Sequence, residues 1–167
     1  MKLILVRHAE AEPVGEGGAA TDYDRALTEL GQKQADALTQ AIAKLKLPLG
    51  LVLTSPYVRA LQTAEPLAAI LTPGTPPQKE DHLRLEEMKP RKLAKVIAEL
   101  GQTVVYVVGH MPDLGRFAGW LLGCGTTTIL FEKSAAALIT TGKSVEKGTG
   151  ELRWLATPDW FMDHPTA

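Results

Sequence analysis

Three short apolar runs without polar alternation constrain the fold of this chain more than any other feature. They cover residues 3–6 (LILV), 51–54 (LVLT) and 104–108 (VVYVV). Strands of this kind are usually buried on both faces, as they are in a parallel sheet covered by helices. We therefore predict that the three runs are core strands of such a sheet.

Helical patterns and turn signals separate these runs. We predict helices from an N-cap at Thr28 to a stop before Pro48, from an N-cap at Ser55 to residues 73–74, over 90–100, and from Pro112 to about 122. Two further strands, over 134–141 and 151–155, are predicted to form a hairpin at one sheet edge. This alternation predicts an α/β fold: a three-layer α/β/α domain with a mostly parallel central sheet.

Composition limits the domain count and the kinds of partner. With 167 residues, 45% hydrophobic and 22% charged, the chain fits a single domain over residues 1–167. Its 18 Lys and Arg against 19 Asp and Glu give a formal net charge of -1, which provides no global field for nucleic acid or an acidic membrane. No apolar run approaches the roughly 20 residues of a membrane-spanning helix. We expect no nucleic-acid or membrane partner, and any anion site must be local.

The single cysteine and the start of the chain indicate a compartment. Cys124 has no partner for an internal disulfide, which is compatible with a reducing cytoplasm, and we predict it to be buried at a helix end. The first strand begins at Lys2 and leads into the candidate site, so we expect no cleaved signal peptide. The expected location is cytoplasmic.

Cationic and imidazole side chains follow the three core runs. Arg7 and His8 end the first run, Arg59 lies one turn into the helix after the second, and His110 follows the third. Ligands of open α/β sheets bind beyond the carboxyl ends of the strands, so these residues are predicted to meet in one pocket. Arginine offers a planar fork of donors matched to phosphate, and histidine is a nucleophile available near neutral pH.

Four ordered motifs extend this pattern along the chain. They are RHA at residues 7–9, LTxxGxxQA at 27–35, SPxxRAxQTA at 55–64 and VGH at 108–110. Together they resemble the histidine phosphatase superfamily, whose fold is phosphoglycerate mutase-like. The short length, without a large inserted helical region, resembles the SixA-type phosphohistidine phosphatases, and residues 109–114 and 152–158 look like bacterial members of that group.

The resemblance implies a role for each pocket residue. His8 would be the nucleophile that becomes phosphorylated, while Arg7, Arg59 and His110 bind and polarise the phosphoryl group. The backbone amide of Met111 would be a further donor at a helix start, and His110 is expected to be protonated when it faces phosphate. The implied enzyme is a metal-independent phosphatase without a cofactor, and its oligomeric state is not indicated.

The general acid and the substrate are less sharply specified. Glu86 or Glu87 could donate a proton, and a solvated charge pair at a helix start is the alternative reading of both. The lack of a clearly placed general acid favours P–N substrates or activated esters over sugar phosphates, because a phosphohistidine leaving group can be protonated on its far ring nitrogen whereas an alkoxide needs a proton. The expected partner is a phosphorylated protein, such as a histidine-phosphotransfer domain or a phosphotransfer-system protein, or a small phosphorylated substrate.

Several alternatives remain open. The glycine-containing loop over 13–24 could fold over a ligand or be a surface connection, and Asp24 with Arg25 is read as a surface ion pair outside the site. A metal hydrolase would use His8 and His110 as ligands, although their spacing fits no metal motif. Residues 137–144 nearly match a P-loop but read better as a hairpin turn. Two further alternatives to a phosphohistidine phosphatase are a small-molecule phosphomonoesterase of the same superfamily and a non-catalytic phosphate-binding module.

Overall fold

A mixed six-stranded sheet forms the centre of the protein in the computed structural model, which describes residues 1–125, 129–142 and 144–162. The strands are β1 (Lys2–Arg7), β2 (Leu51–Thr54), β3 (Gln78–Lys79), β4 (Val104–Gly109), β5 (Ala136–Thr141) and β6 (Gly150–Ala156). They lie in the order β3-β2-β4-β1-β5-β6. The pairs among β1 to β4 are parallel, and β5 runs antiparallel to both of its neighbours. The three apolar runs are therefore adjacent core strands, as predicted.

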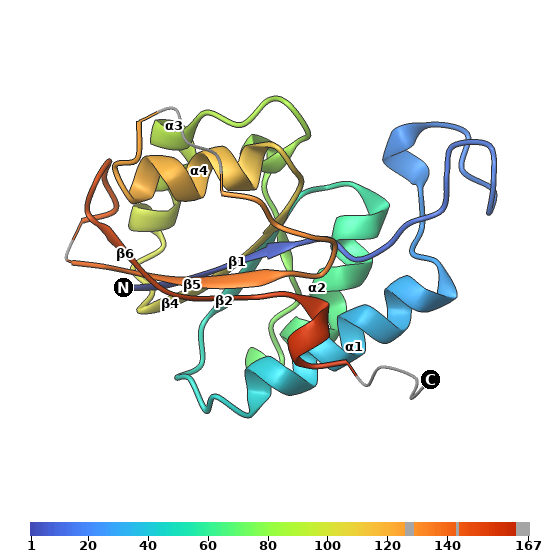
Figure 1. Cartoon of the computed structure of the whole chain (residues 1–167), viewed down its shortest axis with the longest axis horizontal. Coiled ribbons are helices and arrows are strands. Elements are labelled where there is room, and N and C mark those ends of the chain that lie inside the picture. Colours follow the sequence, from blue (N-terminus) through green and yellow to red (C-terminus); the bar gives the residue numbers. More distant parts are fainter. Residues whose placement is uncertain (126–128, 143, 163–167) are drawn as a thin grey trace.

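Helices cover both faces of this sheet and complete the predicted α/β/α layering (Figure 1). They are α1 (Glu29–Ala43), α2 (Val58–Leu71), α3 (Pro90–Glu99) and α4 (Asp113–Leu121), with short 3-10 turns η1 (Asp22–Asp24), η2 (Asp81–Leu83) and η3 (Pro158–Trp160). Ile4 and Val6 of β1 pack in the cluster with α1 and α2, while Leu3 and Leu5 pack in the cluster with α3 and α4. Burying each such side chain contributes about 1.5–3 kcal/mol. The lack of alternation in the sequence thus reflects two covered faces.

Two helix starts show how local hydrogen bonding sets the boundaries. Thr28 caps α1 as predicted, because its hydroxyl accepts the amide of Gly31 at 2.9 Å. The predicted N-cap at Ser55 is wrong: α2 begins at Val58, after Tyr57. The Ser55 hydroxyl lies 2.7 Å from a ring nitrogen of His110 instead. The side chain predicted to cap the helix therefore contacts His110 instead.

The second half of the sheet settles the P-loop alternative. Residues 137–141 belong to β5, and the chain returns antiparallel as β6, so the predicted hairpin is confirmed. A P-loop requires a helix after its glycine-lysine step, whereas Gly142 is followed by a turn into a strand; Lys143 lies outside the described residues. Strand β3, whose two residues pair with the end of β2, was not predicted.

Cys124 is exposed, so its predicted burial is wrong. Helix α4 ends at Leu121, and Gly123 and Gly125 both have positive φ (72° and 65°), which turns the chain away from the core around the cysteine. Within the described part of the chain, no helix is long and apolar enough to cross a bilayer.

Candidate active site

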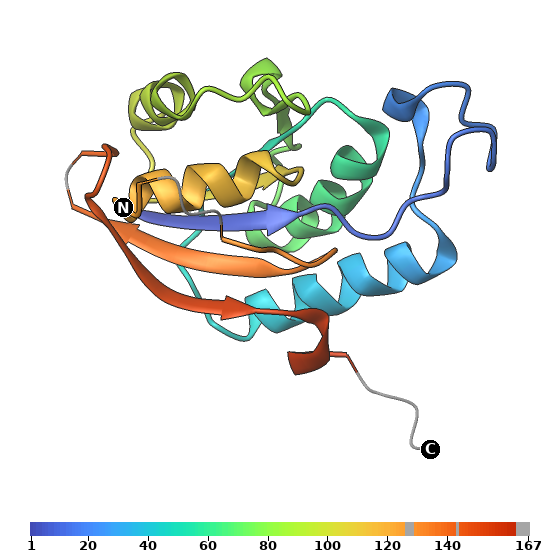
Figure 2. The ribbon, with the colours of Figure 1, turned by 45° about the horizontal axis from the view of Figure 1, so that its top comes forward.

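The carboxyl ends of β1, β2 and β4 bring the predicted residues together at one edge of the sheet. Arg7 of β1 is in register with Gly109 of β4, and the His8 amide donates to the Gly109 carbonyl at 3.0 Å. The ring centroids of His8 and His110 are consequently 5.0 Å apart. In Figure 2, the turned view, β1 (blue) runs away from the N-terminus toward the end where the segment after it projects from the sheet. The two histidines separated by about a hundred residues thus share one pocket.

His8 is held in a single neutral form. Its Nδ1 lies 2.7 Å from the Ala9 carbonyl oxygen, an acceptor, so Nδ1 carries the proton. Its Nε2 accepts a hydrogen bond from Arg59 Nε at 3.2 Å. Burial, followed by the charges of Arg59 and Arg7, lowers the pKa of His8 to about 3. At neutral pH the ring is therefore uncharged, with the Nε2 lone pair directed at a guanidinium.

Arg59 is oriented from both ends of its guanidinium. It is the second residue of α2 and its side chain is only 2% exposed. While Nε faces His8, Nη1 donates to the Asp22 carbonyl oxygen and Nη2 donates to Asp22 Oδ2, at 2.9 Å for the latter. Burial lowers the pKa of Arg59, yet an arginine stays protonated in proteins. The site thus holds a fixed cation against His8 Nε2.

Arg7 supplies a second buried cation. Its Nη1 donates to the Phe131 carbonyl oxygen at 2.8 Å, which fixes the guanidinium at the end of β1. Its Nε is buried and has no hydrogen-bond partner within residues 1–125, 129–142 and 144–162. A buried donor without an acceptor costs about 1–3 kcal/mol, so this nitrogen is suited to an anion.

His110 is neutral in the free site. The Ser55 hydroxyl accepts the Tyr57 amide and lies 2.7 Å from His110 Nε2, so a hydrogen bond joins that ring nitrogen to the hydroxyl. The other ring nitrogen, Nδ1, is buried and has no hydrogen-bond partner among the described residues. Burial, followed by the neighbouring His8 and Arg59, lowers the pKa of His110 to about 2. The protonated form expected opposite a phosphate concerns the bound state and stays a prediction.

Three further motif residues support the chain that follows His8. Thr63 Oγ1 accepts the Ala9 amide at 3.0 Å, and Gln34 Oε1 accepts the Glu10 amide at 2.9 Å. Gln62 Oε1 accepts the Leu27 amide at 2.7 Å. Thr63 and Gln34 thus fix the backbone directly after His8, and Gln62 fixes the start of the second motif.

The loop over 13–24 reaches the pocket through one residue that sequence reasoning missed. The Asp22 carboxylate bridges Arg59 and Arg25, with Oδ1 2.8 Å from Arg25 Nη1. Both arginines lower the pKa of Asp22, so it is ionised at neutral pH. The predicted Asp24–Arg25 pair is wrong, because Asp24 instead accepts the Thr21 hydroxyl at 2.6 Å. A carboxylate three residues before an arginine was the only sequence signal for this contact.

The two candidate acids lie in a turn ahead of α3. Glu86 and Glu87 are both exposed, as the solvated reading expected, but α3 begins only at Pro90, so they are not helix-start residues. The Glu86 amide donates to buried Asp113 at 2.6 Å, which ties this turn to the start of α4. Met111 lies two residues before α4 and packs partly against the core.

Two tyrosines adjoin the pocket residues. The Tyr57 ring lies 4.9 Å from the His110 ring, centroid to centroid, and Arg59 Cζ lies 4.9 Å from the Tyr57 centroid. Tyr23, in η1, contacts Tyr57 with a centroid distance of 5.0 Å. Neither tyrosine was singled out from the sequence, since an isolated aromatic residue carries no positional signal.

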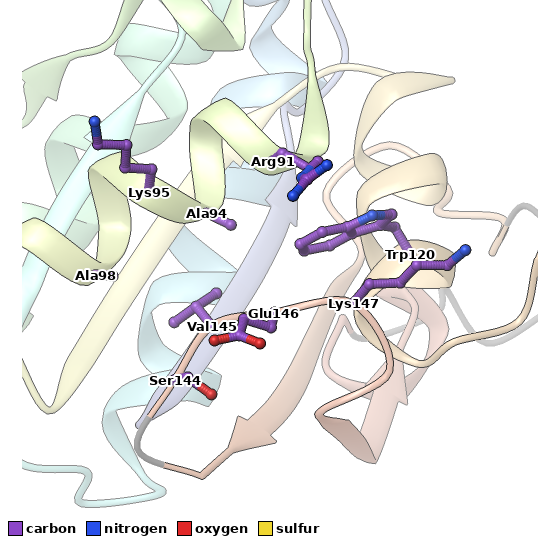
Figure 3. A pocket seen from close by; sticks show the side chains of 9 residues that line it. All are labelled: Arg91, Ala94, Lys95, Ala98, Trp120, Ser144, Val145, Glu146 and Lys147. Atoms are coloured by element: carbon purple, nitrogen blue, oxygen red, sulfur yellow. The ribbon is translucent and has the colours of Figure 1, made fainter.

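A cavity of about 720 Å³ lies away from these residues. It is bounded by Arg91 and Lys95 of α3, Trp120 of α4, and Glu146 and Lys147 of the β5–β6 turn (Figure 3). None of the residues around His8 lines it. For the metal-hydrolase alternative, residues 1–125, 129–142 and 144–162 contain no cluster of three or more His, Cys, Asp or Glu that could hold an ion.

Comparison with known proteins agrees with this geometry. The model of the histidine phosphatase superfamily (branch 1) matches residues 3–110. The chain belongs to the histidine phosphatase superfamily. It is 32% identical over 177 residues to an uncharacterised protein of Picosynechococcus sp. (strain ATCC 27264 / PCC 7002 / PR-6), covering 97% of this chain and 99% of that protein.

SixA proteins are similar in both sequence and structure. Phosphohistidine phosphatase SixA of Escherichia coli (strain K12) is 28% identical over 165 residues, covering 95% of this chain and 94% of that protein. The structure of the protein histidine phosphatase SixA complexed with tungstate superposes with a TM-score of 0.82 at 26% identity, covering 95% and 98% of the two chains. The predicted phosphoglycerate mutase-like fold is thereby confirmed, and the chain is a SixA-like member of its superfamily.

Proposed function

We propose that the protein is a metal-independent phosphatase that acts through a phosphorylated His8 and removes phosphoryl groups from phosphohistidine in proteins. In this proposal, residues 1–167 form one histidine phosphatase domain that works in the cytoplasm. The catalytic residues are Arg7, His8, Arg59 and His110, and the Met111 amide is a further phosphate donor.

The observation that carries the proposal is the state of His8. Its proton is held on Nδ1 by the Ala9 carbonyl, and its Nε2 lone pair faces Arg59 Nε at 3.2 Å. A phosphoryl group placed at Nε2 would lie against that guanidinium. Fixed donors next to the attacking atom stabilise the charge of the transition state without reorganising during the reaction.

The reaction consists of two displacements at phosphorus. In the first, His8 Nε2 forms a bond to phosphorus while the bond to the leaving group breaks. In the second, water attacks the phosphorylated His8, inorganic phosphate is released and the His8 lone pair is restored. Arg7 Nε and His110 Nδ1 are both buried without a hydrogen-bond partner in the described part of the chain. Arg7 Nε donates to phosphoryl oxygens in each step, and Nδ1 does so when His110 is protonated.

The acid–base groups around His8 support a P–N substrate. Asp22 is ionised beside two arginines and Glu86 and Glu87 are exposed, so none of these three carboxyl groups is a buried, protonated acid. Imidazole leaves as a neutral ring when its far nitrogen is already protonated, which its pKa of about 6.5 allows near neutral pH. The similar SixA of Escherichia coli is a phosphohistidine phosphatase by name.

A substrate panel tests the proposed specificity. We expect the purified protein to release phosphate from a phosphohistidine-bearing histidine-phosphotransfer domain and from a phosphotransfer-system protein, with little release from glycerol phosphate. EDTA should leave the rate unchanged and vanadate should abolish it. Efficient hydrolysis of aliphatic phosphomonoesters with no action on phosphohistidine would instead establish the small-molecule phosphomonoesterase, and loss of activity with EDTA would establish a metal hydrolase.

A further inference from the structure

Four aromatic rings form a continuous line from the nucleophile to the surface. Successive centroid distances are 5.0 Å from His8 to His110, 4.9 Å from His110 to Tyr57, and 5.0 Å from Tyr57 to Tyr23. The first two rings are buried, Tyr57 is half-buried, and Tyr23 is 37% exposed. The line therefore begins at the reacting nitrogen and ends at solvent.

Tyr57 is fixed against the phosphate-binding groups. Its backbone precedes α2, and its amide donates to the Ser55 hydroxyl that holds His110. Arg59 Cζ lies 4.9 Å from the centroid of its ring, a cation–π arrangement that orients ring and guanidinium together. The Tyr57 ring is thus within one ring contact of two of the groups that would bind a phosphoryl group.

Tyr23 is held in place through its neighbour. Asp22 anchors η1 to Arg59 by both its carbonyl and its carboxylate oxygen. Tyr23 follows in the same turn and meets the Tyr57 ring at an interplanar angle of 47°. Two aromatic side chains from separate segments, Tyr23 from 13–24 and Tyr57 just before α2, therefore form one aromatic wall beside His110 and Arg59.

We infer that Tyr57 and Tyr23 form a leaving-group subsite that selects a planar imidazole ring, an inference that rests on the proposed function. In-line attack by His8 Nε2 expels the leaving group on the opposite side of phosphorus. The P–N electron pair returns to the leaving nitrogen, and the proton already on the far nitrogen makes the product a neutral imidazole. Stacking on the tyrosines holds that ring while the bond breaks. An aliphatic or ammonia leaving group lacks a π face and gains nothing from the wall.

Two small P–N compounds separate recognition of the ring from recognition of the P–N bond. Phosphoimidazole carries the aromatic leaving group, and phosphoramidate carries only an amine. We expect Tyr23→Leu, which leaves the contact of Tyr57 with Arg59 in place, to lower kcat/KM for phosphoimidazole about fivefold to tenfold, the scale of one aromatic contact. The loss for phosphoramidate should be much smaller, so the ratio of the two constants falls.

Matched variants distinguish this role from a structural one. Tyr57→Phe and Tyr23→Phe keep the rings and should keep the wild-type ratio. Trp160→Leu removes an 81% exposed aromatic residue outside the ring line and should leave both constants unchanged. Equal losses on both compounds in Tyr23→Leu would overturn the subsite while leaving the phosphatase proposal intact. Hydrolysis of neither compound by the wild-type protein, with no phosphate on His8, would overturn both.

Discussion

At the scale of single residues, the site depends on how the Arg59 guanidinium is shared between His8 and Asp22. The Nε edge of Arg59 faces His8, while its two terminal nitrogens are held by Asp22. A phosphoryl group at His8 Nε2 would therefore meet Arg59 at its Nε, while Asp22 keeps Nη1 and Nη2 in place. Asp22 thus limits the rotation of Arg59 without occupying the nitrogen next to the nucleophile.

Replacing Arg59 by lysine tests whether this geometry matters beyond charge. Arg59→Lys keeps the positive charge but loses the fork, so we expect kcat/KM for a phosphohistidine substrate to fall about 10²-fold, as for loss of one preorganised donor. Arg153→Lys, at an exposed arginine of β6, is the control and should leave kcat/KM unchanged. Wild-type activity in Arg59→Lys would show that charge alone suffices.

The pocket residues could be predicted from sequence, but their partners could not. Arg7, His8, Arg59 and His110 each follow a core strand, a local pattern that is visible along the chain. Asp22 reaches Arg59 across 37 positions, and no local pattern encodes that contact. Ser55 carried a misleading local signal, because its hydroxyl suits a helix cap as well as a histidine.

At the scale of elements, α1 and the segment after β1 pack without room for a side chain between them. A Cβ on Gly31, in the first turn of α1, would lie 1.9 Å from the Glu10 carbonyl oxygen. That same oxygen accepts the Thr28 amide at 3.1 Å. The glycine of the second motif therefore lets the helix approach the backbone two residues beyond His8.

Gly31→Ala should displace that backbone and weaken both folding and catalysis. We expect the free energy of unfolding, measured with urea, to fall by about 1–3 kcal/mol, the cost of overpacking, together with a lower kcat. Gly142→Ala is the matched control, since a Cβ there meets nothing within 4 Å and no positive φ is involved. Equal stability of the two variants would contradict the close packing of α1 on residue 10.

The loop over 13–24 should depend on Asp22 for its attachment. Asp22→Ala removes the bond to Arg59 Nη2 and the ion pair with Arg25, so we expect faster cleavage after exposed Glu16 by a glutamate-specific protease. Mass spectrometry of the fragments identifies the site. Asp81→Ala, which breaks a surface pair with Arg84, is the control. An unchanged cleavage rate in Asp22→Ala would show that other contacts hold the loop.

Helices and strands were predicted correctly where the apolar or helical pattern in the sequence was long. Prediction failed where the local structure depends on residues distant in the sequence. The core runs match their predicted ranges closely because burial on both faces leaves a continuous apolar pattern in the sequence. Helix α3 matches because a proline at its start and a glycine after its end mark its bounds. Strand β3 consists of two exposed residues, Gln78 and Lys79, whose extended form depends on β2 beside them. The outward turn at Cys124 depends on two left-handed glycines rather than on the apolar residues before it.

At the scale of the whole molecule, the site makes folding sensitive to acid. The folded state keeps His8 and His110 neutral, with pKa values of about 3 and about 2, whereas an unfolded histidine has a pKa near 6.5. Between these values the unfolded chain binds more protons than the folded chain. Stability is therefore fully present above pH 6.5 and is lost as the pH falls toward 3.

Urea unfolding between pH 6 and pH 4 measures this loss. Each buried neutral histidine should contribute about 1.4 kcal/mol per pH unit to the decline in the free energy of unfolding. His110→Asn should reduce the slope by that amount. His82→Asn, at a histidine outside the buried pair, controls for removal of an imidazole elsewhere. Identical slopes in the wild type and in His110→Asn would show that His110 is not held neutral by the fold.

Transfer of phosphate to His8 is the most direct test of the central claim. The protein is mixed briefly with a phosphohistidine substrate labelled with ³²P, quenched in alkali, and digested for mass spectrometry. We predict an acid-labile, alkali-stable phosphate on the peptide containing His8, absent in His8→Ala and in unreacted protein. Labelled substrate that binds without a phosphorylated His8 or released phosphate would contradict this claim and identify a non-catalytic phosphate-binding module.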